Sequence, residues 1–138
     1  MAASLETLSH TADTGIEVRA DTLAELFEWA ARGMFGLMFD LGGLVPERDL
    51  DIEVQAPSLP DLLVDTLSEL LYRSEADDAL PCAFAVEEAS ATRARMKVGL
   101  TTAGRSLHGP PVKAVTYHAL VVAQTPDGRW LARVVFDV

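Results

Sequence analysis

Apolar residues alternate with polar ones in several short segments, and this period of two is typical of β-strands. The clearest case is 50–55, where three aliphatic residues alternate with two acids and a glutamine. That pattern indicates a strand with one face in water, near the edge of a sheet. The sequence predicts strands over residues 5–8, 16–19, 50–55, 84–86, 94–100 and 130–137.

Two longer segments carry apolar residues at spacings of three and four, which predicts amphipathic helices. The first begins after Thr22, which forms a capping-box pattern with Glu25, and ends near Phe39. The second begins after Ser58, a favourable N-cap residue, and has Pro60 in its first turn. Between the first two strands, the residue types of 10–15 favour a loop with a sharp turn at Gly15. We expect each helix to bury its apolar stripe against a sheet.

The longest run of β-branched and aromatic residues is 112–122, bounded by prolines before it and by a Pro-Asp-Gly turn after it. It predicts one long strand, apolar on both faces and therefore central in its sheet. The polar residues of this run lie in its first half. From spacing alone, Tyr117 and His118 are expected to be buried polar residues with structural partners, and Lys113 to extend its stem over apolar neighbours.

The order of elements is two strands, a helix, a strand, a helix and then several strands. We therefore predict an α+β fold with two helices packed on a largely antiparallel sheet or pair of sheets. With 138 residues and about half of them hydrophobic, the chain suits one domain over residues 1–138. No apolar run reaches the length of a membrane span and the first residues lack a leader pattern, so we expect a soluble, cytoplasmic protein with no membrane partner.

The formal net charge of −10 disfavours RNA as a lone partner and suits divalent cations or a basic protein. The chain has a single cysteine, Cys82, which excludes an internal disulfide and a cysteine-rich zinc site. No phosphate-binding loop, dinucleotide fingerprint or serine nucleophile elbow occurs.

Oxygen ligands offer the remaining candidate chemistry. His10 and Asp13 lie in a predicted turn, and Asp137 adjoins the last residue, Val138. Carboxylate and carbonyl oxygens are the ligands that calcium, magnesium and manganese take. On chemistry alone, the structural interpretation is favoured: Asp13 forming a turn and Asp137 being a solvated residue near the chain end.

Several motifs together resemble the archease family. They are His10-Thr11-Ala12-Asp13 with Gly15, residues 24–28, Leu62-Leu63 with residues 67–71, the string Val112-Lys113-Ala114-Val115-Thr116-Tyr117-His118, and the ending 132–138. The resemblance covers essentially the whole chain in the right order. The Lys-Ala-Val-Thr-Tyr-His string and the terminal hydrophobic-Asp-hydrophobic ending are the specific parts. The segment 106–111, with His108, stands where family members often carry a charged, histidine-containing segment.

The resemblance implies an archease-like fold and an accessory role rather than catalysis. Archease-like proteins activate a GTP- and metal-dependent RNA ligase of tRNA splicing, promoting its guanylylation and multiple turnover. The family's metal ligands match Asp13, Asp137 and Val138, and a position tied to activation matches Lys113. His10 and His118 belong to the same motifs, so we group them with Lys113 as candidate activation residues. The expected cofactor is a divalent cation, and tRNA would be an indirect partner only.

Two other functions stay open on the residues. A small metal-dependent phosphohydrolase would need a general base near its metal, for which His10 or His118 is available. A general chaperone or assembly module would need an exposed apolar patch, whereas the apolar residues here follow core spacing. The sequence leaves open the oligomeric state, the natural metal, the docking surface and the RNA substrate.

Overall fold

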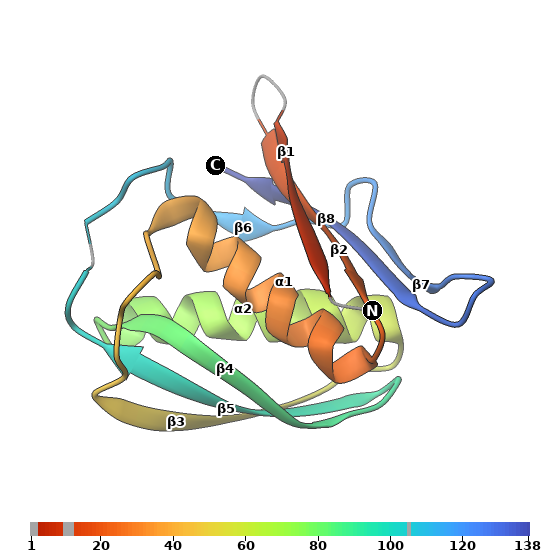
Figure 1. The fold of residues 1–138 in the computed structure, drawn as a ribbon, viewed down its shortest axis with the longest axis horizontal. Helices are drawn as coiled ribbons and strands as arrows, with labels where there is room; N and C mark the ends of the chain where they lie inside the picture. The colour runs from red at the N-terminus through yellow and green to blue at the C-terminus, as the bar shows by residue number, and fades with distance from the viewer. Residues whose placement is uncertain (1–2, 10–12, 105) are drawn as a thin grey trace.

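The structure is a computed structural model that describes residues 3–9, 13–104 and 106–138. Two antiparallel sheets enclose two helices between them (Figure 1). The larger sheet has the strand order β1-β2-β8-β6, with β7 also paired to β8, and the smaller has the order β3-β5-β4. This arrangement confirms the predicted α+β class, in its form with a pair of sheets.

The strands of the larger sheet come from both ends of the chain. They are β1 (Ser4–Ser9), β2 (Asp13–Ala20), β6 (Ala114–Val115), β7 (Val121–Gln124) and β8 (Trp130–Asp137). The smaller sheet consists of β3 (Arg48–Gln55), β4 (Leu80–Ala89) and β5 (Arg93–Thr101). β3 lies at an edge, as its alternating pattern predicted.

The helices α1 (Leu23–Met38) and α2 (Leu59–Ala76) begin where their N-caps predicted, and α1 ends next to Phe39, as expected. The Thr22 hydroxyl accepts the Glu25 amide, and the Ser58 hydroxyl accepts the Asp61 amide. Each cap satisfies an amide that the first helical turn leaves without a partner. Within the described residues, neither helix combines the length and apolar character that crossing a membrane would require.

The core fills the space around the two helices. α1 contacts β1, β2 and β8 on one side and β4 on the other, so it buries residues around most of its circumference. Phe35 of α1 stacks on Phe84 of β4, with ring centroids 6.1 Å apart. The Glu28 carboxylate of α1 accepts the Val86 amide of β4, close to a register shift in that strand. The side chains of α1 therefore tie the smaller sheet to the larger one.

The prediction of one long central strand over 112–122 is wrong. The segment forms β6, then a turn, then β7, and both strands pair with the same neighbour, β8. Thr116 bonds the Val135 carbonyl through both its amide and its hydroxyl, at 3.1 and 2.8 Å. Ala119 then adopts a positive φ of 52°, and the Leu120 amide donates to the Tyr117 carbonyl. A turn thus interrupts the run of strand-forming residues, and the central position belongs to β8.

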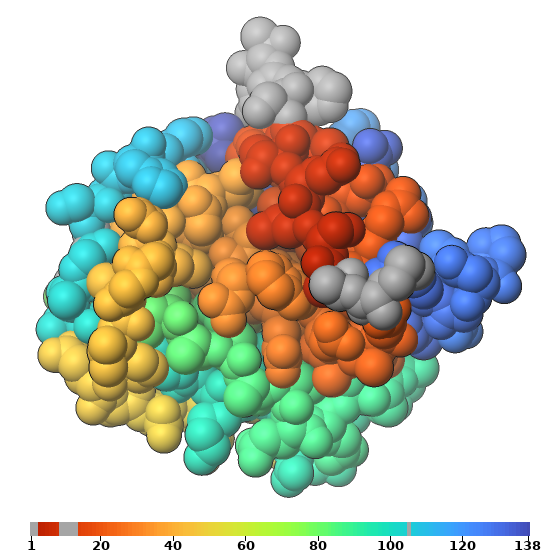
Figure 2. All heavy atoms as spheres, viewed as in Figure 1, coloured from red at the N-terminus to blue at the C-terminus, as the bar shows by residue number. Residues whose placement is uncertain are grey.

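The hairpin predicted at Pro126-Asp127-Gly128 is confirmed. It joins β7 to β8 and projects from the side of the molecule (Figure 2). Gly128 takes a φ of 85°, a conformation that costs glycine little. The Thr125 amide donates to the Arg129 carbonyl at 2.7 Å and closes the turn.

Gly15 lies inside β2 rather than in a turn, which corrects the loop predicted over residues 10–15 as far as residues 13–15 are concerned. A Cβ atom added at Gly15 would stand 2.5 Å from the Val134 carbonyl oxygen of the neighbouring strand. Since that oxygen belongs to backbone in the middle of the sheet, it has little freedom to move away. Glycine is needed here for close approach between strands.

Gly15→Ala is therefore expected to lower the free energy of unfolding by about 1–3 kcal/mol, the usual cost of overpacking. Gly36→Ala is the matched control, because a Cβ at Gly36 in α1 would meet nothing within 4 Å. Since alanine favours a helix more than glycine does, Gly36→Ala should raise the free energy of unfolding by roughly 0.5–1 kcal/mol. Urea unfolding of the two variants measures both changes. Equal stability of the two variants would contradict the close approach at Gly15.

Candidate functional site

Three segments far apart in the sequence meet at the end of β8. Asp13 of β2 and Asp137 of β8 are register partners in the antiparallel pair. On the other side of β8, Ala114 of β6 is the register partner of Asp137, and the Lys113 amide donates to the Asp137 carbonyl at 2.7 Å. The sheet thus places Asp13, Asp137 and Ala114 in one row across three strands, and Lys113 directly precedes this row at the start of β6.

The alternation of β8 decides which of its side chains point away from the helices. Ala132, Val134 and Phe136 are fully buried against the core. Asp137 and Arg133, at the intervening positions, are exposed, and Val138 packs against the core while half-buried. The pattern of the sequence therefore sets the Asp137 carboxylate on the outer face of the sheet.

The row has the donor chemistry of a hard-cation site. Residues directly opposite each other in an antiparallel pair have Cα atoms only about 4.5–5.5 Å apart. Asp13 and Asp137 hold that relation, and the main-chain oxygens of Val138 follow immediately. Among the side chains that the structure describes, no three histidine, cysteine, aspartate or glutamate residues form a metal-binding cluster, and Asp13 is not among those side chains. Aspartate carboxylates and main-chain oxygens are the donors that a hard divalent cation takes, so the residue types at positions 13, 137 and 138 are chemically suited to such an ion.

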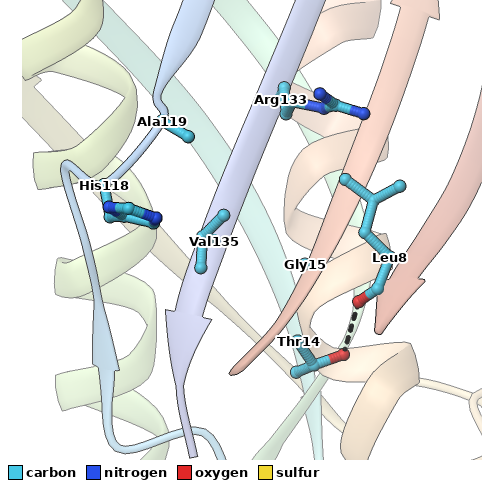
Figure 3. Close-up of a pocket in the computed structure, with 7 residues that line it drawn as sticks. All are labelled: Leu8, Thr14, Gly15, His118, Ala119, Arg133 and Val135. Carbon is cyan, nitrogen blue, oxygen red and sulfur yellow. Dashed lines mark hydrogen bonds between the residues drawn. The ribbon is translucent and has the colours of Figure 1, made fainter. Parts of the chain in front are cut away.

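A pocket of about 360 Å³ lies on the outer face of the larger sheet, next to this row (Figure 3). It is lined by Leu8, Thr14, Gly15, His118, Ala119, Arg133 and Val135. Gly15 and Val135 are register partners, two positions along their strands from Asp13 and Asp137. The structure thus brings the predicted residue His118 to a pocket lined by Gly15 and Val135, near the end of the β2–β8 pair.

The turn after β6 positions His118. The Thr116 hydroxyl, fixed on the Val135 carbonyl, accepts the His118 amide at 3.3 Å. His118 is exposed, so the expectation that it is a buried residue is wrong. Sequence reasoning did not single out Thr116, whose role depends on a carbonyl nineteen residues away.

Lys113 is exposed as well and lines a different hollow, of about 260 Å³. Its neighbours there are Ser68, Leu71, Tyr72, Glu75, Ala114 and Val115, from α2 and β6. Its ammonium forms no ion pair with any carboxylate whose side chain the structure describes. The Lys113 ammonium is thus available to a partner on the side of α2, while the Lys113 backbone is bonded to Asp137 of β8.

Of the other two histidines, His10 lies outside the described residues. His108 is held at the end of α1, where its amide donates to the Met38 carbonyl at 2.8 Å and its Nε2 lies 3.0 Å from the Gly36 carbonyl oxygen. It lines a hollow with α1 and β1 rather than the pocket of His118.

Tyr117 bonds α2 instead of entering the core. It is 56% exposed, and its hydroxyl donates to the Asp61 carboxylate at 2.8 Å. This bond raises the pKa of Tyr117, and burial and the nearby Asp65 charge raise it further. The Tyr117 and Ser58 hydroxyls together lower the pKa of Asp61. The predicted structural partner exists, but the predicted burial is wrong.

The Tyr117–Asp61 bond predicts a titration that is easily observed. The tyrosinate absorbance lost in Tyr117→Phe should titrate above pH 10, and Asp61→Asn should move that titration down because it removes the charged acceptor. In the folded protein the pKa of Tyr117 is raised, so its contribution to stability is present below its unfolded pKa, near 10, and is lost as the pH rises further. An unchanged titration in Asp61→Asn would show that the bond does not persist in solution.

Comparisons with known proteins agree with the fold and with the motifs. Residues 5–138 match the sequence profile of the Archease protein family (MTH1598/TM1083). A protein archease of Methanosarcina acetivorans is 37% identical over 96% of this chain and 94% of its own length. A protein archease of Methanopyrus kandleri is 36% identical over 96% of this chain and 98% of its own length.

Solved structures of relatives have the same fold. The solution structure of Methanobacterium thermoautotrophicum protein 1598 superposes with a TM-score of 0.79 at 28% identity, covering 97% of this chain and 98% of that one. The crystal structure of a Thermotoga maritima archease, described as a possible chaperone, gives a TM-score of 0.66 at 21% identity, covering 96% of each chain. The two sheets around two helices define a small α+β domain. This chain belongs to the archease family.

Proposed function

We propose that this protein activates a GTP- and metal-dependent RNA ligase of the tRNA-splicing type, by promoting guanylylation and multiple turnover of that ligase. Family membership supports an accessory role rather than catalysis, because neither the family description nor the names of the relatives describe a catalytic activity. The observation that carries the proposal is that Asp13, Asp137 and Lys113 meet at the end of β8. The β2–β8 register sets the two aspartates opposite each other, and the Lys113 amide bonds the Asp137 carbonyl.

In this proposal Asp13, Asp137 and the main-chain oxygens of Val138 hold a calcium, magnesium or manganese ion. Such an ion, when bound, supplies positive charge that attracts phosphate oxygens. The protein's own contribution is to hold the two aspartates at opposite register positions and to bond the Lys113 backbone to that of Asp137. Lys113 adds a second positive group, on a flexible stem, at the same end of the sheet.

The overall charge favours a protein partner over RNA as the primary contact. A net charge of −10 repels a phosphate backbone, whereas a ligase that binds RNA must present basic surface. Opposite charges steer two such proteins together and raise their association rate. RNA would then be contacted by the ligase, and tRNA would be an indirect partner of this chain.

The decisive experiment follows transfer of radiolabel from GTP to the partner ligase, with and without this protein, at limiting manganese. We expect more labelled ligase per unit time with the protein present, and several rounds of RNA sealing per ligase instead of one. A labelling rate that is the same with and without the protein, over a range of metal concentrations, would reject the proposed activation.

The isolated protein is expected to show no turnover of its own with GTP or with an RNA 2′,3′-cyclic phosphate. The chain offers no recognised nucleophile arrangement, and burial, followed by the Glu47 charge, raises the pKa of Cys82 and keeps it a poorly reactive thiol. Product release assays on purified protein test this. Product in excess of protein, lost in Asp137→Ala, would support the phosphohydrolase alternative instead.

A further inference from the structure

One surface of α2 carries polar and aromatic residues in a continuous stripe. Asp61, Asp65, Ser68 and Tyr72 recur at spacings of four, three and four, so they lie along one face of the helix. The last three are exposed, and the opposite side of α2 is buried in the core. We call these four residues the α2 stripe.

Residues 113–117, which include β6, border this stripe at both of its ends. Tyr117 bonds Asp61 at the N-terminal end of α2. Lys113, Ala114 and Val115 share a hollow with Tyr72 at the other end. Helix α2 and residues 113–117 therefore form one continuous surface, which ends at Lys113.

Exposed aromatic side chains are concentrated on this surface. Within the described residues, five large hydrophobic side chains are exposed, and the two tyrosines among them are Tyr72, at 64%, and Tyr117, at 56%. Tyrosine is enriched at protein interfaces and among the residues that contribute most to binding. Tyr117 is already held by Asp61, so it would lose little conformational freedom when a partner binds.

The charges around the tyrosines are mostly negative. Asp61 and Asp65 belong to the α2 stripe, and Glu75 lies in the same hollow as Tyr72. The nearby cation of α2, Arg73, is paired with Asp77 at 3.6 Å. Carboxylates beside exposed aromatic rings suit arginine, which pairs with carboxylates through its planar donors and stacks on aromatic faces. The chemistry of the surface therefore selects a partner with exposed arginines.

We propose that the α2 stripe, with Tyr117, is the surface on which this protein docks an arginine-bearing protein partner. The inference rests on the proposed function in identifying that partner as the RNA ligase, and it adds where the contact is made. A partner bound along the stripe reaches Lys113 at its end. Because the Lys113 amide bonds the Asp137 carbonyl, that end of the surface is also close to Asp137. Docking on α2 would then direct the partner's nucleotide site toward the residues proposed to act on it.

The test measures binding of the full-length protein to the partner ligase by biolayer interferometry, together with guanylylation of the ligase. Tyr72→Ala should weaken the Kd by tenfold or more, mainly through faster dissociation. The double variant Asp65→Lys, Glu75→Lys should slow association and reduce its dependence on salt. When enough of the Tyr72→Ala variant is added to saturate the ligase, guanylylation should proceed at the wild-type rate, because Asp13, Asp137 and Lys113 are unchanged.

Two control variants match these changes on the smaller sheet and the segment before it. Asp49→Lys and Val45→Ala alter an exposed acid and an exposed apolar residue there, and neither should change the Kd. Thermal melting checks that every variant is folded. If Tyr72→Ala and the double lysine variant both bind the ligase with wild-type affinity and still stimulate it, the α2 stripe is not the docking surface. The proposed activation would be unaffected by that result. A wild-type protein that binds through the stripe without stimulating the ligase would overturn the activation instead.

Discussion

Asp137→Ala is expected to weaken divalent-cation binding strongly and, with it, to reduce stimulation of the ligase. Asp137 and Asp13 stand opposite each other at the end of the β2–β8 pair, so each would supply a carboxylate to the same ion. The affinity of a site for a hard cation depends strongly on the number of charged ligands. Loss of one carboxylate from so small a set should weaken calcium or manganese binding by roughly 100-fold, as measured by calorimetry. Asp13→Ala should have an effect of similar size.

The fold should tolerate the change, because Asp137 is exposed and its backbone bonds remain. Asp49→Ala, on an exposed position of β3, is the matched control and should bind the cation like the wild type. Deleting Val138 should weaken binding without unfolding the domain. Undiminished calcium or manganese binding by both Asp13→Ala and Asp137→Ala would show that the ion, if bound, lies elsewhere.

Lys113→Ala is expected to abolish or strongly reduce stimulation of ligase guanylylation while leaving melting temperature and cation affinity near wild type. The Lys113 ammonium is exposed and forms no ion pair within the described side chains, so its removal costs the fold little. Its amide bond to Asp137 is a backbone bond and survives the substitution. The variant therefore separates activation from folding and from metal binding.

Lys113→Arg is the finer variant, because it keeps the charge and changes the arrangement of hydrogen-bond donors. Full activity of Lys113→Arg with none in Lys113→Ala would indicate that charge alone is required. Arg95→Ala in β5 controls for the loss of one positive charge from the surface. Full stimulation by Lys113→Ala at saturating GTP and manganese would remove Lys113 from the site.

The helices were predictable because the signals that define them are local. Thr22 and Ser58 each act on an amide three residues ahead, so their caps are visible in the sequence without knowledge of the fold. The alternation in 50–55 and 130–137 likewise reports which face of a strand is buried. These features predicted the α+β class and the two helices with their first residues.

The run 112–122 shows where local reasoning fails. Its residues favour a strand throughout, but Thr116 bonds a carbonyl of β8 and the chain turns at Ala119. Exposure of Tyr117 and His118 follows from that turn. Strand propensity describes a fit to a half-buried pleated surface, and it cannot indicate where a neighbouring strand offers an acceptor that ends the pairing.

The sequence by itself determined the two helices, most of the strands, the acidic character and the family motifs that single out Asp13, Lys113 and Asp137. Only the tertiary structure decided that these three meet at one end of a sheet, since the β2–β8 register pairs Asp13 with Asp137, more than one hundred residues away, and β6 brings Lys113 to the other side of β8. It also decided that Tyr117 meets Asp61 on α2. Such relations depend on which strands and helices pack side by side, and the packing of distant segments leaves no periodic signal in the chain.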